Sequence, residues 1–259
     1  MARRILEIAA NSLASALAAR DGGADRIELC ANLAEGGTTP SFGTLATTRD
    51  ALRIPIYVLI RPRAGDFLYG SNERDEMLRD IEACAQLGCD GVVIGALDAE
   101  GDVDIALCRD LIAAAGKLGV TFHRAFDVAR DQRSALETIT SLGCERVLTS
   151  GACASAQEGA ESIAALVKQA DGRIRIMAGG GVRTEQLPEL IARTGANEFH
   201  ASAGVPRISA MRHHNPDLRG LNANWMQSDV EQIRRLRAAL DAAPRARSDE
   251  IIPPGLVGN

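Results

Sequence analysis

The 259-residue sequence predicts an α/β fold, a single (β/α)8 TIM barrel followed by a loose C-terminal tail. Three observations support this fold class. Short strand-like runs alternate with amphipathic helix-like runs along the chain, and this alternation requires a parallel sheet. A glycine precedes most of the expected strands, because glycine readily ends a helix. Eight strand-and-helix units also suit the length of a typical barrel.

The strands are recognised as short β-rich runs, several of which alternate apolar and polar side chains. In chain order they are expected at residues 4–8, 25–30, 55–61, 91–95, 120–123, 146–150, 174–178 and 197–201. The helices between them are recognised by apolar residues spaced three or four apart. Two capping patterns, Ser155 with Glu158 and Ser228 with Glu231, predict helix starts at those positions.

One domain accounts for the sequence. No linker divides it, so we expect the barrel to span residues 1–243. Residues 244–259 are rich in proline, glycine and charge, which predicts a flexible tail. A doubly wound open sheet is the alternative fold. The strand count and the lack of a G-x-G-x-x-G motif after the first strand disfavour it.

Composition argues against several classes of function. The formal net charge is -5, whereas nucleic-acid-binding proteins usually carry a basic face. No apolar run approaches the ~20 residues of a membrane span, and the N-terminal residues are too polar for a signal peptide. We therefore expect a cytoplasmic protein without a nucleic-acid or membrane partner. The six cysteines form no C-x-x-C pair, so most are expected to be reduced and buried.

Strand alternation places many polar side chains inside the expected barrel, since alternate residues of a barrel strand face inward. With the apolar residues facing the helices, the inward set is Glu7, Arg26, Glu28, Cys30, Tyr57, Leu59, Arg61, Thr121, His123, Glu198, His200 and Ser202. Barrel interiors are normally filled by branched aliphatic residues, so this charge exceeds what packing needs. Two interpretations stay open. Glu7, Glu28, Arg61 and the histidines form an internal salt-bridge network, or they form an active site at the C-terminal ends of the strands.

The end of the fifth expected strand concentrates polar groups. His123, Arg124 and Asp127 lie within five residues of one another. Unpaired and buried, these groups would be costly, so we expect them to satisfy one another or a ligand. His123 or Glu28 is then a candidate general acid or base. Arg61 and Arg124 are candidates for stabilising developing negative charge.

Two loops indicate an anion site. Gly179, Gly180 and Gly181 follow the seventh expected strand. Ser202 and Gly204 follow the eighth. Small residues let backbone N–H groups approach a phosphate or carboxylate, and barrels often bind phosphate at this position. Tight turns without a ligand are the alternative.

The loops after the second and third strands are expected at the same end of the barrel. Residues 35–41 contain two glycines and are expected to be flexible enough for a lid. Their alternative is an ordinary polar loop. Residues 61–67 would bring Arg61 or Arg63 to the same anion.

Metal binding is a further possibility, although no H-x-H, H-E-x-x-H or C-x-x-C motif occurs. Cys30 ends an inward-facing strand beside Glu28. A thiolate is a soft ligand that suits Cu(I), so Cys30 is a candidate copper ligand. No nucleotide-cofactor motif is visible, so no nucleotide cofactor is expected.

Several blocks of sequence resemble the CutC copper homeostasis family. They are residues 6–8, 24–30, 35–41, 60–63, 65–67, 121–127, 148–151, 177–182 and 198–200. The resemblance runs from about residue 5 to about residue 241, with a loose fit over residues 207–224. It implies a cytoplasmic TIM-barrel protein that self-associates as a dimer or larger oligomer and is linked by name to copper. The proposed copper ligands of the family are cysteines, which by resemblance indicates Cys30.

Two functions follow. The first is copper homeostasis with Cu(I) bound at Cys30. The second is a lyase- or isomerase-type enzyme that acts on a small anionic or phosphorylated metabolite. The candidate catalytic residues of that enzyme are Glu7, Glu28, Arg61, His123, Arg124, Asp127 and His200. Its candidate anion-binding residues are Arg63, Gly179, Gly180, Gly181, Ser202 and Gly204. In a third interpretation, a structural or partner-binding barrel, the interior polar residues matter only for stability.

Overall fold

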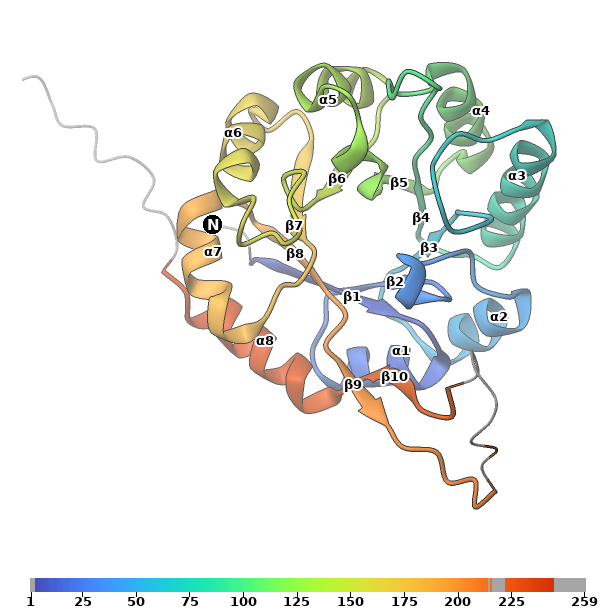
Figure 1. The fold of residues 1–259 in the computed structure, drawn as a ribbon, viewed down its shortest axis with the longest axis vertical. Helices are drawn as coiled ribbons and strands as arrows, with labels where there is room; N and C mark the ends of the chain where they lie inside the picture. The colour runs from blue at the N-terminus through green and yellow to red at the C-terminus, as the bar shows by residue number, and fades with distance from the viewer. Residues whose placement is uncertain (1–2, 214, 216–221, 245–259) are drawn as a thin grey trace, which may run out of the picture.

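The computed structural model describes residues 3–213, 215 and 222–244, and in this part of the chain eight parallel strands close into a barrel (Figure 1). Around the barrel they are β1 (Ile5–Ala10), β2 (Arg26–Leu29), β3 (Ile56–Leu59), β4 (Gly91–Ile94), β5 (Gly119–Phe122), β6 (Arg146–Thr149), β7 (Arg175–Gly179) and β8 (Glu198–Ala201). The pairing of β8 with β1 closes the ring, with Ile5 opposite Glu198. The predicted (β/α)8 barrel is confirmed.

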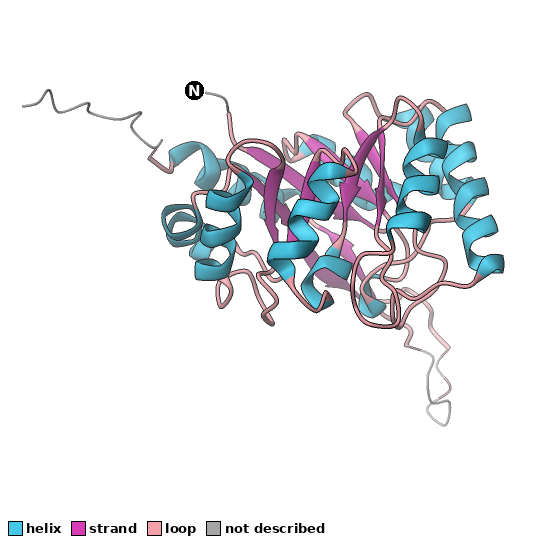
Figure 2. Ribbon diagram, turned by 90° about the horizontal axis from the view of Figure 1, so that it is seen from above, coloured by secondary structure: helices cyan, strands magenta, loops and turns pink. Residues whose placement is uncertain are grey.

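A helix follows each strand and covers the outside of the barrel (Figure 2). These helices are α1 (Leu13–Asp21), α2 (Phe42–Ala51), α3 (Ser71–Gln86), α4 (Ile105–Ala115), α5 (Gln132–Ser141), α6 (Ala160–Ala170), α7 (Leu187–Thr194) and α8 (Val230–Ala242). Short 3-10 helices stand in three loops, η1 (Leu33–Glu35), η2 (Arg124–Val128) and η3 (Thr184–Gln186). Between β8 and α8 lie two antiparallel strands, β9 (Gly204–Arg207) and β10 (Trp225–Ser228).

The larger apolar core lies between the strands and the helices. Leu6 and Ile8 of β1 belong to it and are completely buried. Burial of such apolar side chains holds the helices to the barrel. The opposite strand faces point inward, where a second, smaller apolar cluster contains Ala9, Cys30, Tyr57, Leu59 and Val93. The predicted inward and outward faces of the first three strands are therefore confirmed.

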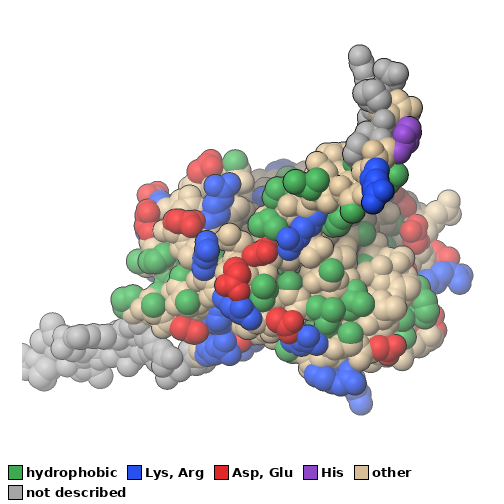
Figure 3. Space-filling view, turned by 90° about the horizontal axis from the view of Figure 1, so that it is seen from below, with side chains coloured by type: hydrophobic (Ala, Val, Ile, Leu, Met, Phe, Trp, Pro, Cys, Tyr) green, Lys and Arg blue, Asp and Glu red, His purple; other side chains and the backbone are tan. Residues whose placement is uncertain are grey.

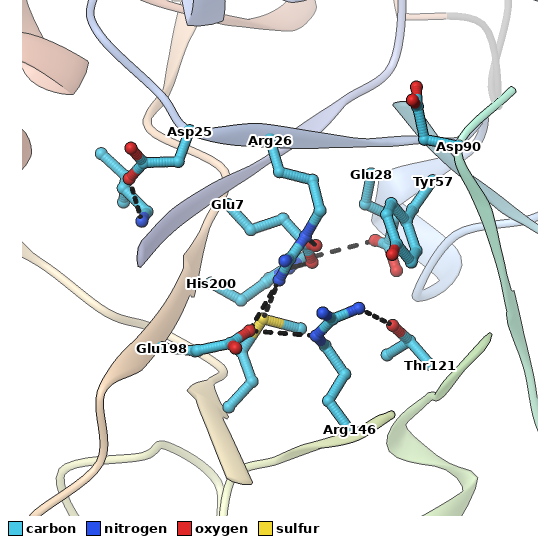
Figure 4. A network of polar contacts seen from close by, with 12 residues as sticks. Glu7, Asp25, Arg26, Glu28, Tyr57, Asp90, Thr121, Arg146, Glu198 and His200 are labelled. Atoms are coloured by element: carbon cyan, nitrogen blue, oxygen red, sulfur yellow. Dashed lines mark hydrogen bonds and ion pairs between the residues drawn. The ribbon is translucent and has the colours of Figure 1, made fainter. Parts of the chain in front are cut away.

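The barrel interior also contains a buried ionic network (Figure 4). Arg26 forms an ion pair with Glu7 and donates from Nη2 to Glu198 Oε2 at 2.9 Å. Arg146 donates from Nε to the same Glu198 oxygen at 3.0 Å. Its Nη1 donates to Thr121 Oγ1 at 3.0 Å. Every charge in this group has a partner, as buried ions require. An internal salt-bridge network is thus present. Of the expected members it includes Glu7, whereas Arg61 bonds backbone carbonyls instead, and it adds Arg146, which strand alternation had not singled out.

The Tyr57 ring fills the space beside this network. The guanidinium carbons of Arg26 and Arg146 lie 5.1 and 4.9 Å from the ring centroid, a cation–π arrangement. Gly91 and Gly119 make room for the ring, since a Cβ at either position would lie 2.2 Å from a Tyr57 atom. These glycines are therefore required by packing inside the barrel.

Two helices begin later than the capping patterns predicted. The Ser155 hydroxyl accepts the Glu158 N–H at 3.3 Å, but turns follow before α6 begins. Asp229, and not Ser228, caps α8 by accepting N–H groups of its first turn at 3.1 and 3.2 Å. Ser228 is unavailable because it is the last residue of β10 and its hydroxyl donates to Ala9 O.

Two predictions concern residues that lie partly outside the described chain. The predicted tail, residues 244–259, lies outside the described residues except for Pro244, and part of residues 207–224 lies outside them as well. Among the helices that are described, none combines the length and the apolar character needed to cross a membrane.

Candidate functional site

A cavity of about 260 Å³ lies at the C-terminal ends of the barrel strands. Its walls include residues that follow β2, β3, β5, β7 and β8. Eight of the predicted site residues line it, namely Glu28, Arg61, His123, Arg124, Gly180, Gly181, His200 and Ser202. Residues far apart in the sequence thus meet at the position where barrel enzymes hold their substrates.

Six predicted site residues do not line the cavity: Glu7, Cys30, Arg63, Asp127, Gly179 and Gly204. Arg63 pairs with Glu73 and Asp66 in its own surroundings. Glycine is required by packing at position 179, because a Cβ there would lie 2.4 Å from Leu148 Cδ1. Gly204 pairs with a residue of β10. None of these three residues lines the cavity, although the anion-site prediction expected each of them there.

His200 lies between two glutamates at the centre of the barrel (Figure 4). Its Nδ1 is 2.8 Å from Glu7 Oε1, and its Nε2 is 3.7 Å from Glu28 Oε2. Burial alone would raise the pKa of Glu7, but the Arg26 charge and the His200 hydrogen bond together lower it to about 2. Glu7 is therefore ionised, and it holds the proton of His200 on Nδ1.

Glu28 has the opposite titration behaviour. Burial, assisted by the Glu7 charge, raises the pKa of Glu28 to about 7 although His200 acts in the other direction. Burial opposes the charged form of His200, yet the Glu28 and Glu7 charges leave its pKa raised. A carboxyl group with a pKa near neutrality at a cavity wall is suited to proton transfer.

The same three residues are the described group best able to hold a metal ion. One ligand atom from each of Glu7, Glu28 and His200 lies within 4.8 Å of the others. Oxygen and imidazole ligands suit cations such as Zn²⁺ or Mn²⁺ and do not suit Cu(I). Both Glu7 oxygens already contact Arg26 or His200. The arrangement as it stands therefore favours proton transfer over metal binding.

His123 is held in one tautomer. Its Nδ1 accepts the Ala125 N–H at 3.1 Å, so its own proton is on Nε2. Burial, with a contribution from the Arg61 charge, lowers the pKa of His123 to about 3. A neutral imidazole at physiological pH is a poor proton carrier, which disfavours the acid–base role expected for this residue.

Arg61 joins two loops at the cavity edge. Its Nη1 donates to Glu35 O at 2.9 Å and to Gly37 O at 2.7 Å. Its Nη2 donates to Gly65 O at 2.8 Å. The loop that was expected to be a lid is thus tied to the loop after β3 by a buried guanidinium. In this state it is a wall of the cavity.

Arg124 is placed by a group behind the cavity. Its Nε donates to Asp127 Oδ2 at 2.7 Å, and its Nη2 donates to Ser150 Oγ at 2.8 Å. Asp127 also accepts the Ser150 N–H. Gly180 has a φ of +94° and a Cβ there would lie 3.5 Å from Arg124 Cζ, so glycine lets the loop approach the guanidinium. Asp127 is a positioning residue, and Ser150 belongs to this group without having been predicted.

Cys30 lies in the inner apolar cluster and is completely buried. Burial, together with the Glu28 and Glu7 charges, raises the pKa of its thiol. The thiolate form that binds Cu(I) is therefore disfavoured in this state. All six cysteines are free, and Cys153 is the one that is not buried, in agreement with the expected reduced thiols.

Comparison with known proteins is consistent across sequence and structure. The pattern described as the CutC family matches residues 4–205. A CutC family protein of Xanthomonas campestris pv. campestris (strain B100) is 56% identical over 238 residues, covering 92% of this chain and 99% of that protein. A CutC family protein of Parabacteroides distasonis is 48% identical over 241 residues, or 93% and 99%.

Similar solved structures include two at different levels of sequence identity. A Streptococcus agalactiae protein named as a copper homeostasis protein, CutC, has a TM-score of 0.74 and 34% identity, covering 77% of this chain and 98% of that chain. A protein described as an aldolase has a TM-score of 0.60 and 16% identity, covering 78% and 91%. At that identity, the second likeness concerns the fold alone.

Proposed function

Because this chain belongs to the CutC family, we propose that its cellular role is in copper homeostasis and that its molecular activity is acid–base chemistry on a small anionic metabolite. One observation carries the second part. Glu28 and His200 border the same cavity as Arg124 and the backbone of Gly180 and Gly181. A proton-transfer pair and an anion-binding wall around one cavity are the components that such a reaction needs.

Each component has a role in this proposal. The N–H groups of Gly180 and Gly181, the Ser202 hydroxyl and the Arg124 guanidinium bind the anionic group. Glu28 takes up or releases the proton, because its pKa of about 7 makes both forms available. Glu7 is charged and buried, and it orients the His200 ring, which in turn supports Glu28.

The test is a thermal-shift screen of wild type against phosphorylated metabolites. A ligand at one hundred times its dissociation constant adds about 2.7 kcal/mol of stability. We expect such a shift to disappear in Arg124→Gln and to persist in Arg63→Gln, whose side chain lies outside the cavity lining. Turnover of the ligand should be lost in Glu28→Gln with binding retained. Absence of any anion-dependent shift in the wild type would remove the basis of the proposal.

Direct Cu(I) binding at Cys30 is a second candidate. It is favoured by the place of this free thiol, which packs in the inner cluster with Leu59, a cavity-lining residue. Binding would require deprotonation of the thiol and entry of the ion. Competition with a Cu(I) chelator under reducing conditions tests it, using Cys30→Ser and the buried Cys108→Ser as matched variants. Equal Cu(I) affinity in wild type and Cys30→Ser would eliminate this site.

We also propose self-association and a cytoplasmic location. Free cysteines suit a reducing compartment. The arm made by β9, β10 and the described residues between them is anchored where β10 packs on α1, and its far end extends beyond the body of the molecule (Figures 1 and 3). It carries four large exposed apolar side chains, Ile208, Met211, Trp225 and Met226. Exposed apolar side chains of this size are typical of a protein–protein contact, and a second copy of the chain is the partner that the family resemblance implies.

A further inference from the structure

His123 has a hydrogen-bond donor without an acceptor. Its Nε2 is buried, lies on a residue that lines the cavity, and has no partner among the described residues. The whole side chain is only 4% exposed. A buried donor without an acceptor destabilises a protein, so its presence at a cavity wall points to an acceptor supplied by a ligand.

The position of this donor is closely defined. Gly95 leaves the space that the imidazole occupies, because a Cβ there would lie 2.5 Å from ring atoms of His123. The Phe67 ring packs on it with centroids 5.1 Å apart. The bond from the Ala125 N–H fixes the other ring nitrogen as an acceptor. The donor therefore has one orientation and one tautomer before any ligand arrives.

The charge around the donor suits a developing oxyanion. The Arg61 charge acts on His123 strongly enough to contribute to its lowered pKa. Three Arg61 hydrogen bonds go to backbone carbonyls, so this residue supplies charge more than contacts for a ligand. A neutral imidazole N–H can polarise a carbonyl oxygen and hold it as it becomes negative without giving up its own proton.

We propose that His123 Nε2–H binds the carbonyl oxygen of the substrate, and that the anionic metabolite is therefore a small carbonyl compound that is enolised in this cavity. This inference rests on the proposed acid–base function and deepens it. The three walls then have separate tasks. Arg124 and the Gly180–Gly181 backbone hold the anionic group, Glu28 faces the acidic carbon, and His123 holds the oxygen.

The step balances within the site. The Glu28 carboxylate takes a proton from the carbon next to the carbonyl. The C–H bonding pair becomes a C=C bond, and the carbonyl π pair moves onto the oxygen held by His123. Return of the proton to carbon restores a carbonyl compound. Where the deprotonated carbon bears a hydroxyl, that hydroxyl gives its proton to the first oxygen, and the proton held by Glu28 is delivered to the former carbonyl carbon. The C=C pair forms that new C–H bond and the hydroxyl oxygen becomes the new carbonyl, so the carbonyl moves by one carbon and no oxidant or reductant is needed.

The test compares two probes by calorimetry. Inorganic phosphate reports the anion wall alone, and phosphoglycolohydroxamate adds a planar hydroxamate that mimics an enediolate. In the wild type we expect the hydroxamate to bind roughly tenfold to a hundredfold more tightly than phosphate, the range for a hydrogen bond to a charged group.

Two variants divide the functions of the His123 ring. In His123→Asn the amide oxygen takes the place of Nδ1, so the contact with Ala125 N–H is kept and the Nε2 donor is lost. In His123→Gln the amide nitrogen takes the place of Nε2, so the donor is kept and the local contact is lost. We expect the preference for the hydroxamate to disappear in the first variant and to survive in part in the second. Phosphate affinity should stay unchanged in both.

The contrary outcomes are distinct. An equal hydroxamate preference in wild type and His123→Asn would overturn the inference, as would loss of phosphate binding in that variant, which would make His123 part of the anion wall. Phosphate binding without a hydroxamate preference in the wild type would overturn it while leaving the proposed function standing. Failure of both probes to bind the wild type would reject the proposed function and the inference together.

A measurement on the unmodified protein gives an independent check. Nitrogen-15 spectra of its four histidines should show one imidazole protonated on Nε2 across neutral pH. That Nε2 proton should move downfield when the hydroxamate binds and stay in place when phosphate binds. An Nδ1-protonated His123 in the free protein would contradict the geometry on which the inference stands.

Discussion

At the scale of single residues, the environment of each side chain decides its protonation state. Glu7 and Glu28 lie on neighbouring strands and both contact His200, yet their pKa values are about 2 and about 7. Arg26 makes the difference, because it forms an ion pair with Glu7 and not with Glu28. One glutamate is thereby a permanent anion and the other a proton carrier.

The lowered pKa of Glu7 predicts acid sensitivity. Its folded-state pKa of about 2 lies below the ordinary value of 4.5, so the unfolded chain binds more protons in this interval. The stabilisation is complete above pH 4.5 and is lost as the pH falls toward 2. In Glu7→Gln we expect a less stable protein whose free energy of unfolding changes less over that interval. Urea unfolding at several pH values measures it, with the exposed Glu100→Gln as control, and an unchanged pH slope in Glu7→Gln would contradict the assignment.

Alternation along the strands predicted most inward-facing residues of the site but not their partners. Glu28, His123 and His200 were placed at the cavity from sequence because a strand has a period of two. Ser150 and Asp127 could not be assigned to their shared role, since their contact depends on how the loop after β6 folds against η2. Cys30 could not be assessed either, because burial and nearby carboxylates raise its pKa only in the folded chain.

At the scale of elements, the strands were predicted well and the helix starts less well. Strand positions depend on local alternation and on the burial of one face, which the sequence displays. The start of α8 depends on Ser228 being used by β10, a pairing with β9 across an intervening segment. A cap can be recognised from sequence only when no distant strand competes for the same residue.

The junction of β4 with its loop makes a prediction about packing. Gly95→Ala would place a methyl group 2.5 Å from the His123 ring, and overpacking of this kind costs about 1–3 kcal/mol. Gly43→Ala in α2 has its nearest contact at 3.9 Å and should stabilise the helix by about 0.5–1 kcal/mol. Thermal unfolding of the two variants should therefore move in opposite directions. A Gly95→Ala variant as stable as the wild type would show that the ring has room to shift.

At the scale of the whole molecule, the barrel was predictable because eight repeats of one pattern leave few other topologies. How the barrel interior is divided between an ion-pair network and a cavity could not be predicted. The Arg26, Arg146 and Glu198 network occupies one part of the interior, and the cavity occupies the C-terminal end. Alternation identifies which residues point inward, but it does not tell which of them will pair with one another and which will face a ligand.

The exposed arm predicts the behaviour of the molecule in solution. Ile208 is 84% exposed. Covering such an apolar side chain with a second copy of the chain removes it from water, which stabilises the association. Ile208→Glu should shift sedimentation toward the monomer and leave the melting temperature of the monomer unchanged. Val128→Glu, at another exposed apolar position, 60% exposed and in η2, is the matched control. Self-association that survives Ile208→Glu would locate the contact elsewhere.

The contacts of Arg61 have a consequence for local unfolding. One guanidinium holds the carbonyls of Glu35, Gly37 and Gly65, so neither loop can open without breaking bonds that also secure the other. The two loops should therefore open as one cooperative unit, and their protected amides should exchange with solvent deuterium at a common free energy. Replacing Arg61 would separate this unit into two, each with its own, lower barrier to exchange.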